Sequence, residues 1–518
     1  MLGEVVREAA RRFGDTPAFV SAEGHPLTYS DLDRLSDQVA AGMRGLGVGL
    51  GDVVALAMRS GPGYVVAYAA AAKLGAVTAG VNERLSAPER AACLDRVRPA
   101  LVITDSDAST PDASRSRGST ASRQTLPPGS QLVLTDPSSP VEDLLRELRD
   151  ECSRAPALEP DPDRPVAIVF TSGTTGFPKG AVFCGRQLDA IGEADGGGRF
   201  GGGGRGLGST SMSHLATMTK LPQNLRSGGT TFLMRRWSAP AALEMIERHG
   251  ITTLGGIPTQ VALMLRDESF DSTDTSSVRL IALGGGPSAP SLVREARQRF
   301  GVPVIVRYTC TEAGVGTGTA PDDPHEDAEE TVGRPRPGVE LTIRDPSGTR
   351  LAPGEIGEVC LRSEAVMSGY FEDEAATVAA MTADGAARTG DLGFTDQRGR
   401  LHLRGRAKEM YVRGGYNVFP LEVEAALSEH PAIAQVAVIP RSDPVMGEIG
   451  VAVVVAREGS PPPQLDELRL HAQDKLAHHK LPEAILVLDE LPRTAMEKVD
   501  RRALQATVNE NLTAAGGD

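Results

Sequence analysis

The sequence predicts a multidomain α/β protein, and three observations support this class. Apolar strand patterns alternate with helical patterns over the first 330 residues, which predicts sheets covered by helices. After residue 337 the pattern changes to short strands separated by Gly and Asp, which predicts a small β-barrel. The chain of 518 residues exceeds one ordinary domain, and its 40% of apolar residues suffices for a core.

The N-terminal region contains two strand and helix series, each of which predicts one helix-flanked sheet. The first fifteen residues form an amphipathic helical pattern, and Gly75 ends a helix predicted for residues 64–74. In the first series we expect strands at residues 53–58, 76–81 and 166–170. In the second we expect strands at residues 230–234, 251–254, 278–283 and 304–306, and helices at 239–249 and 259–265.

A shorter α+β pattern begins near residue 408 and predicts a separate C-terminal domain. Its elements are helices at residues 421–430 and 465–480 and strands at 435–440 and 450–456. We therefore divide the chain into an N-terminal domain, residues 1–407, and a small C-terminal domain, residues 408–518.

Two segments have too biased a composition to form a packed core. Residues 105–130 are rich in Ser, Thr, Asp and Pro, which predicts a surface loop. Residues 196–208 contain nine glycines in thirteen positions, and glycine loses the most backbone entropy on ordering. We expect a mobile linker here, and the alternative is a gate over a substrate cavity.

The composition also limits the partners and the compartment. A formal net charge of −14 repels nucleic acid and anionic lipid, so we expect neither as a main partner. The five cysteines are scattered and form no CxxC pair, which argues against a disulfide framework or a structural zinc site. Without a signal-peptide pattern or an apolar run of ~20 residues, we expect a cytoplasmic protein. The sequence indicates no oligomeric state.

The strongest motif is FTSGTTGFPKG at residues 170–180, directly after a predicted strand. Glycine backbone N–H groups, hydroxyl groups and one lysine are the donors that a polyphosphate needs. The spacing of a Walker A loop is absent, so this chemistry leaves an anion-binding loop or an ordinary Gly-rich turn. The candidate ligands are Thr171, Ser172, Gly173, Thr174, Thr175 and Lys179.

This motif resembles the phosphate loop of the adenylate-forming (ANL) superfamily, which includes acyl-CoA ligases, nonribosomal peptide adenylation domains and luciferases. The resemblance extends over nearly the whole chain, because further family motifs follow in the same order. It implies an acyl-CoA ligase that joins a carboxylic acid to coenzyme A through acyl-AMP, using ATP and Mg²⁺. The style of the chain resembles actinobacterial ligases for bulky steroid-like or terpenoid acids, and the diterpenoid-activating ligases of the platensimycin pathway are one candidate.

The resemblance implies an adenine and phosphate site built from two motifs. In YTCTE, Tyr308 would stack on adenine, Thr311 would donate to the α-phosphate and Glu312 would bind Mg²⁺. Thr309 replaces the family's glycine in this motif, which removes freedom for positive φ and adds bulk. Three glycines of ALGGGP would let the adenine ring approach the backbone: Gly284, Gly285 and Gly286.

The resemblance also assigns residues around the domain boundary. Asp391 in RTGDLG would accept from the ribose hydroxyls, and Arg406 would reach the ribose or a phosphate. Lys408 would be the hinge about which the C-terminal domain swings. Near the end of the chain, Lys498 in PRTAMEKV would be the adenylating lysine that bridges acid and phosphate.

Two further segments would bind the acyl group and the thiol. His214, after Ser213, would line the acyl pocket, although a histidine there also fits an ordinary core. Gly414, Gly415 and Tyr416 precede Asn417 in a GGxN segment that would line the pantetheine channel of CoA.

Glu497 departs from the family pattern, in which a glycine precedes the adenylating lysine. A carboxylate ~6 Å from a phosphate, at an effective dielectric constant of ~20, costs roughly 3 kcal/mol. That cost corresponds to about a hundredfold in rate. One hypothesis is therefore that adenylation is impaired and that a separate ligase supplies the acyl-adenylate. The alternative is that Glu497 faces solvent and has little effect.

Two other functions compete with a CoA ligase. An adenylation enzyme that loads a carrier protein would use the same GGxN segment, because both acceptors carry pantetheine. A catalytically silent nucleotide sensor is the third hypothesis, and the retained Lys498, Glu312 and Asp391 argue against it. The identity of the acid lies beyond the sequence, with fatty and aromatic acids as alternatives to a bulky one.

Overall fold

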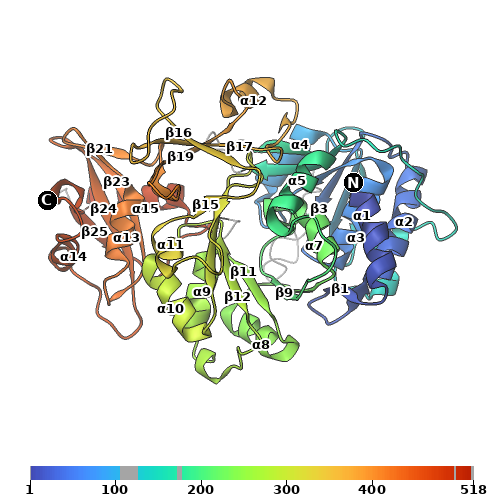
Figure 1. The fold of residues 1–518 in the computed structure, drawn as a ribbon, viewed down its shortest axis with the longest axis horizontal. Coiled ribbons are helices and arrows are strands. Elements are labelled where there is room, and N and C mark those ends of the chain that lie inside the picture. The colour runs from blue at the N-terminus through green and yellow to red at the C-terminus, as the bar shows by residue number, and fades with distance from the viewer. Residues whose placement is uncertain (1, 106–125, 172–177, 495–497, 515–518) are drawn as a thin grey trace.

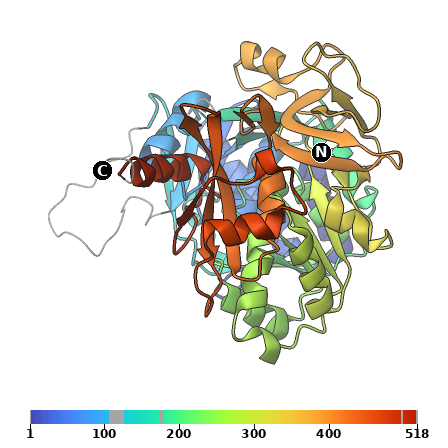
Figure 2. The ribbon, with the colours of Figure 1, turned by 90° about the vertical axis from the view of Figure 1, so that its left-hand side faces the viewer.

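The computed structural model describes residues 2–105, 126–171, 178–494 and 498–514. In this part of the chain three sheets form an N-terminal body, and a fourth sheet forms the C-terminal region at one side of it (Figure 1). Turned by 90°, this C-terminal sheet lies in front of the N-terminal body (Figure 2). The fold is therefore α/β with a large N-terminal and a small C-terminal part, as predicted.

The first sheet has seven strands in the order β18-β8-β7-β4-β3-β5-β6. Its five strands from β7 to β6 are parallel, and β8 and β18 pair antiparallel at one edge. Every residue of β3 and β5 is buried, because helices cover both faces of a parallel sheet. The strands are β3 Val53–Ala57, β4 Val77–Gly80, β5 Leu101–Asp105, β6 Gln131–Thr135, β7 Pro165–Thr171, β8 Lys179–Cys184 and β18 Gly369–Tyr370. The helices of this part are α1 Leu2–Phe13, α2 Tyr29–Gly45, α3 Pro62–Leu74, α4 Ala87–Val97 and α5 Gly185–Gly196, with short 3₁₀ turns at Val141–Asp143 and Arg146–Leu148.

The second sheet has nine strands in the order β15-β14-β13-β12-β11-β9-β10-β1-β2. Its six strands from β13 to β1 are parallel, so their carboxyl ends meet at one edge. The strands are β1 Pro17–Val20, β2 Pro26–Thr28, β9 Arg205–Gly208, β10 Thr230–Leu233, β11 Thr253–Gly256, β12 Leu280–Gly284, β13 Val304–Tyr308, β14 Thr317–Gly318 and β15 Arg334–Pro335. Its helices are α6 Leu215–Met218, α7 Leu221–Ser227, α8 Ala239–His249, α9 Pro258–Arg266, α10 Pro290–Phe300 and α11 His325–Glu330, with a 3₁₀ turn at Phe270–Ser272.

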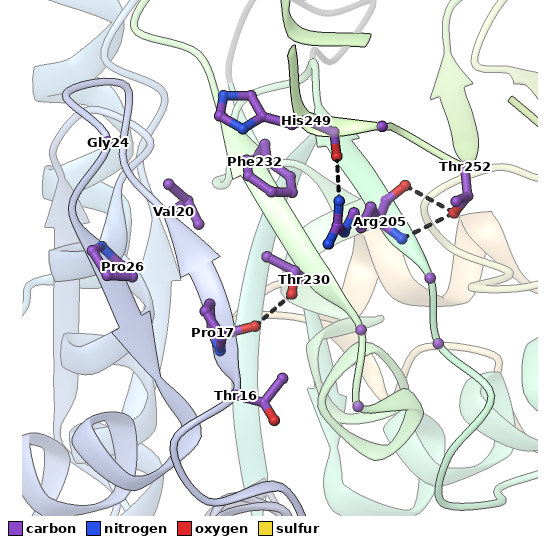
Figure 3. Close-up of a pocket in the computed structure, with 15 residues that line it drawn as sticks. Thr16, Pro17, Val20, Gly24, Pro26, Arg205, Thr230, Phe232, His249 and Thr252 are labelled. Atoms are coloured by element: carbon purple, nitrogen blue, oxygen red, sulfur yellow. Dashed lines mark hydrogen bonds between the residues drawn. The ribbon is translucent and has the colours of Figure 1, made fainter. Parts of the chain in front are cut away.

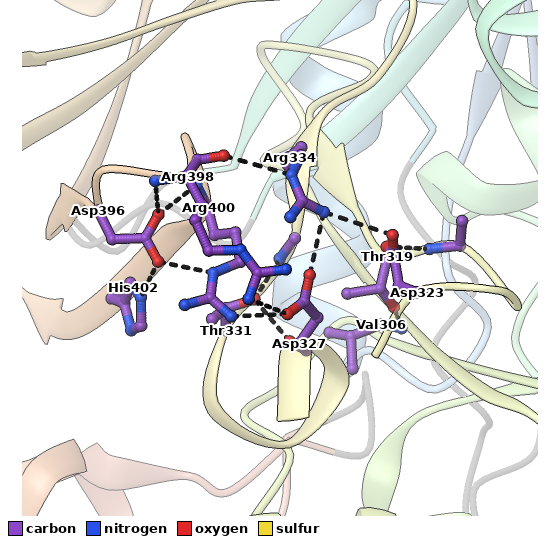
Figure 4. A network of polar contacts seen from close by, with 12 residues as sticks. Val306, Thr319, Asp323, Asp327, Thr331, Arg334, Asp396, Arg398, Arg400 and His402 are labelled. Carbon is purple, nitrogen blue, oxygen red and sulfur yellow. Dashed lines mark hydrogen bonds and ion pairs between the residues drawn. The ribbon is translucent and has the colours of Figure 1, made fainter. Parts of the chain in front are cut away.

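The stretch after residue 337, predicted as a small β-barrel, is a four-stranded antiparallel sheet in the order β16-β17-β19-β20 with helix α12 Glu374–Ala380. The strands are β16 Glu340–Arg344, β17 Gly357–Arg362, β19 Ala387–Thr395 and β20 Leu401–Arg406. A polar network fastens this sheet to α11 (Figure 4). The fully buried carboxylate of Asp327 lies 2.6 Å from the Arg400 guanidinium and 3.0 Å from that of Arg334. A buried carboxylate needs such partners, and the network thereby links α11 to Arg334 of β15 and to Arg400 beside β20.

The C-terminal region is an antiparallel sheet in the order β22-β21-β24-β23, and β25 pairs parallel with β24. Its core contains Val418, Val438 and Leu468, among others. The strands are β21 Tyr411–Arg413, β22 Tyr416–Val418, β23 Ile433–Asp443, β24 Gly447–Ala456 and β25 Ala484–Val487. The helices are α13 Pro420–Leu427, α14 Leu465–Ala472 and α15 Arg501–Ala514, with a 3₁₀ turn at His478–Lys480.

The glycine-rich segment at residues 196–208 differs from the predicted mobile linker. Its backbone is hydrogen-bonded, with Gly201 N–H donating to Arg226 O at 2.8 Å. The segment then continues as β9, which lies between β11 and β10 in the nine-stranded sheet. Close packing requires glycine at some of these positions, since a Cβ on Gly204 would lie 2.2 Å from Thr252 Oγ1. At Gly201 and Gly202 a positive φ favours glycine instead.

The helix predicted at residues 465–480 is also shorter than expected, because it ends at Ala472. The following residues turn inward, and Leu476 and Leu481 join the C-terminal core. Most of the loop predicted at residues 105–130 lies outside the described part of the chain. Among the helices that the structure describes, none combines the length and the apolar character needed to cross a membrane.

Candidate active site

One cleft of about 2450 Å³ lies between the N-terminal body and the C-terminal region. Strand ends of the N-terminal body line it together with residues from β20 onward. Most of the predicted site residues that the structure describes meet in this cleft. They are Thr171, Lys179, His214, Gly284, Gly285, Gly286, Tyr308, Thr311, Glu312, Asp391, Arg406, Lys408 and Lys498.

The carboxyl ends of β12 and β13 form a flat wall of the cleft. Gly284 packs so closely on β13 that an added Cβ would lie 3.1 Å from Arg307 O. Gly285 has a φ of +79°, a conformation that glycine adopts without strain. Thr309 does not adopt a positive φ, so the replacement of the family's glycine by threonine causes no backbone strain at this position. This wall can therefore accept a planar ring.

Asp391 is the centre of a charged group on this wall. Its register in the sheet pairs it with Arg406, whose Nε lies 3.2 Å from Asp391 Oδ1. The Tyr308 hydroxyl donates to Asp391 Oδ2 at 2.7 Å. Burial raises the pKa of Tyr308, and the Asp391 carboxylate raises it further, so the phenol stays protonated as a donor. The carboxylate is held where it can accept from two neighbouring hydroxyls of a ligand.

Glu312 lies across the cleft and has a partner that the sequence analysis missed. The Tyr370 hydroxyl, on β18, donates to the Glu312 carboxylate. The Lys179 ammonium lies 5.2 Å from the centroid of the Tyr370 ring, which is a cation–π distance. Tyr370 thus contacts both Lys179, which is predicted to bind phosphate, and Glu312, which is predicted to bind Mg²⁺. Its surroundings in the sequence carry no pattern that could have identified it.

The same region fits the groups that the motifs imply. Glu312 supplies a hard carboxylate oxygen and Thr311 a neighbouring hydroxyl, which suit Mg²⁺. Lys179, Arg406 and Lys498 supply positive charge on the cleft wall, which suits a triphosphate. The donor set therefore matches a nucleotide and its metal ion.

Lys498 reaches the cleft from the C-terminal region. Its loop is closed by Thr494 N–H, which donates to Lys498 O at 2.8 Å. The surrounding protein removes water from the ammonium and lowers its pKa, Arg406 lowers it further, and Asp391 opposes this. Residues far apart in the sequence thus share one electrostatic environment.

His214 lies at the start of α6, where its Nδ1 accepts weakly from Ala216 N–H at 3.5 Å. Burial lowers the pKa of His214 to about 4, and the Lys498 ammonium acts in the same direction. The imidazole is therefore neutral at pH 7. Because His214 lines the cleft, it is more than a residue of the hydrophobic core.

Some predicted residues lie elsewhere. Gly414 and Gly415, with φ of 53° and 86°, form the turn between β21 and β22. Tyr416 is 59% exposed and stacks on His479 at 4.5 Å between ring centroids. This hairpin does not line the cleft in the described part of the chain. The positions outside the described residues are Ser172, Gly173, Thr174, Thr175 and Glu497.

Comparisons with known proteins agree with this arrangement. Residues 6–371 match the family model "AMP-binding enzyme", and residues 422–498 match "AMP-binding enzyme C-terminal domain". The chain is 33% identical to indoleacetate–CoA ligase of Aromatoleum aromaticum, over 91% of each chain. It is 30% identical to a fatty acid–[acyl-carrier-protein] ligase of Streptomyces coeruleorubidus, over 95% of this chain and 93% of the relative. Its fold matches ATP-bound MatB of Rhodopseudomonas palustris with a TM-score of 0.85 and 25% identity, over 98% of this chain and 99% of MatB.

Proposed function

The chain belongs to the AMP-binding enzyme family of adenylate-forming ligases, and from this premise we propose that it converts a carboxylic acid to its CoA thioester through acyl-AMP. Acyl-CoA ligases of this family use ATP, Mg²⁺ and CoA. The single observation that carries the proposal is the position of Lys498. A lysine from the C-terminal region lines the same cleft as Asp391, Glu312 and His214.

In the first half-reaction, an oxygen of the substrate carboxylate attacks the α-phosphorus of ATP. The new C–O–P linkage forms as the bond to the β-phosphate breaks and pyrophosphate leaves. Lys498 would neutralise charge that grows between the carboxylate and the α-phosphate, which is the kind of electrostatic stabilisation that preorganised groups supply. When bound at Glu312, Mg²⁺ would supply further charge neutralisation of the phosphates.

Other residues would bind and orient the reactants. Asp391 would accept from the ribose hydroxyls, and Tyr308, held by Asp391, would present its ring to adenine. Neutral His214 would stand beside the acyl carbonyl without adding a competing positive charge. Thr171 and Lys179 flank the remaining phosphate-loop positions and would place the triphosphate.

The second half-reaction needs a different set of residues. The thiol sulfur of CoA attacks the acyl carbonyl carbon, the bond to AMP breaks, and the thiol proton leaves with solvent. The Gly414–Gly415 turn would line the pantetheine channel only after the region from residue 408 onward rotates about Lys408. We therefore propose domains at residues 1–407 and 408–518 that alternate between two orientations.

Two finer points belong to the same proposal. The acid is bulky and hydrophobic, and apolar residues such as Phe19, Leu207 and Leu225 line part of the cleft that would hold it. Adenylation is the weaker half-reaction, because the Glu497 carboxylate adjoins Lys498 in sequence and opposes a polyanion. In that case a separate ligase supplies the acyl-adenylate.

The experiment measures the two half-reactions separately. Free acid and ATP are tested for pyrophosphate exchange, and a synthetic acyl-AMP with CoA is tested for thioester formation. The expected result is fast thioester formation with slow exchange that Glu497→Gly accelerates about a hundredfold. Normal exchange by the wild-type protein would refute impaired adenylation, and no thioester under either condition would refute the ligase itself.

A carrier protein is the second candidate acceptor, favoured by the similarity to the Streptomyces ligase. CoA and a phosphopantetheinylated carrier protein are compared as acceptors of the same acyl-AMP. We expect the higher kcat/KM with CoA, and a preference for the carrier protein would replace this assignment.

A further inference from the structure

A second cavity of about 760 Å³ lies against the cleft at the amino ends of β9 and β10 (Figure 3). Four residues line both cavities: Gly204, Arg205, Gly229 and Thr230. The two spaces are thus separated by a partition only one layer of backbone thick.

This partition is closed by hydrogen bonds and tight packing. Gly203 N–H donates to Ser227 O at 2.8 Å, and Thr230 N–H donates to Gly204 O at 3.0 Å. A Cβ on Gly203 would lie 2.4 Å from Gly229 N, and one on Gly229 would lie 2.5 Å from Gly204 O. The chains therefore touch backbone to backbone and leave no passage between the cavities.

The side chains of the partition are engaged with residues of the second cavity. Arg205 Nη1 donates to His249 O at 2.9 Å, and Thr230 Oγ1 donates to Pro17 O at 2.7 Å (Figure 3). Both acceptors belong to residues that line only the second cavity. The partition itself therefore presents mainly backbone to the cleft.

Space for a ligand begins directly beside the partition. From Arg205 the strand β9 runs to Gly208, a distance of about 10 Å along the strand. The chain then continues to His214. A Cβ on Gly206 would meet no atom within 4 Å, and the same holds for Gly255 on the neighbouring strand β11. Both line the cleft and neither has a positive φ, so both tolerate side chains.

The lining of this end has little net charge available to a ligand. Its apolar members include Phe19, Leu207 and Leu225. The nearby Lys220 ammonium is paired with Asp195 at 2.6 Å. The chemistry thus suits an uncharged apolar group rather than a second carboxylate.

Resting on the proposed function, we infer that this closed end holds the far part of the acyl group and that Gly206 and Gly255 set its size. The substrate class is a bulky, ring-bearing hydrophobic acid rather than a long linear one, because the partition stops a long linear chain. A side chain at either glycine occupies the space that the ring needs and leaves the nucleotide end unchanged.

The test measures binding of three acyl-sulfamoyl-adenosines by calorimetry, with propionyl, naphthylacetyl and palmitoyl groups. The wild-type protein should bind the naphthylacetyl compound at least tenfold more tightly than the palmitoyl compound. Gly206→Leu and Gly255→Leu should each weaken naphthylacetyl binding at least tenfold, and propionyl binding should change less than twofold. Gly45→Leu is the matched control, because a Cβ there also meets no atom within 4 Å on an exposed helix end.

Unchanged naphthylacetyl binding in both variants, or wild-type affinity for palmitoyl equal to that for naphthylacetyl, would overturn the inference. Loss of propionyl-compound binding in both variants would also overturn the inference, because the introduced leucines would then disturb the nucleotide end of the cleft. If the wild-type protein binds only the propionyl compound, the inference alone fails. If it binds none of the three, the proposed function fails with it.

Discussion

Two loops of the C-terminal region carry predicted catalytic residues, and the structure places them differently. The loop at Lys498 lines the cleft, where Asp391 and Arg406 act on its pKa. The turn at Gly414 and Gly415 does not line the cleft, and Tyr416 beside it is largely exposed. One region thus carries the residues proposed for two chemical steps, and in this orientation only the lysine proposed for the first step lines the cleft.

The largest expected effect is on Lys498, and it should be confined to one half-reaction. Lys498→Ala removes the cation that we propose stabilises the transition state of adenylation, so pyrophosphate exchange should fall roughly 10²- to 10³-fold. Thioester formation from synthetic acyl-AMP should change less than about threefold. Lys475→Ala is the control, because Lys475 pairs with Glu429 on the surface. If Lys498→Ala slowed both half-reactions equally, the Lys498 loop and the Gly414–Gly415 turn would not serve separate steps.

Asp391 should behave differently, since both half-reactions hold a nucleotide. Asp391→Asn weakens the contact with Arg406 and the binding of ribose, with an expected cost of about 2 kcal/mol. Both half-reactions should then slow by roughly 30-fold, measured as kcat/KM for ATP and for acyl-AMP. If only the rate of adenylation fell, Asp391 would act in the first half-reaction alone, like Lys498, and not in a nucleotide site that both half-reactions use.

A substitution at Gly415 tests the role of the exposed turn, and its expected effect on rate is smaller. Gly415→Ala at a φ of 86° adds backbone strain of roughly 1 kcal/mol and should slow thioester formation about fivefold, with adenylation unchanged. Gly459→Ala is matched, because Gly459 has a φ of 76° and a Cβ there likewise meets no atom within 4 Å. Similar rates for the two variants would show that the turn has no part in the second step.

The smallest effect concerns His214 and pH. Its pKa of about 4 lies below the ordinary value of about 6.5, so protonation favours the unfolded chain. The stability that depends on neutral His214 is complete above pH 6.5 and is lost as the pH falls toward 4. By urea titration, the unfolding free energy of the wild-type protein relative to His214→Gln should fall by about 0.7 kcal/mol from pH 7 to pH 6. A difference independent of pH would contradict the neutral imidazole.

Much of the fold followed from local patterns. The helix predicted at residues 239–249 has the observed bounds of α8, because Gly250 adopts a positive φ and ends it. The predicted buried strand at residues 53–58 is β3 within one residue. Strand β9 escaped prediction, because its glycines gave no apolar pattern and their packing partners lie on other strands.

The candidate site could likewise be predicted only where a local motif identified a residue. Motifs identified Glu312, Asp391 and Lys498 individually, and the cleft brings them together. Tyr370 could not be identified, because its contact with Glu312 joins residues 58 positions apart and depends on how two sheets pack. The partition between the two cavities likewise arises from backbone contacts between Gly203 and Gly229, which no local pattern reports.

The central claim is that the Lys498 loop and the Gly414–Gly415 turn occupy the cleft in alternation. Its most direct test is a crystal structure with a non-hydrolysable acyl-adenylate analogue and CoA bound together. We predict that pantetheine lies against Gly414 and Gly415, and that Lys498 has left Asp391. Pantetheine reaching the acyl group while Lys498 remains beside Asp391 would contradict this account.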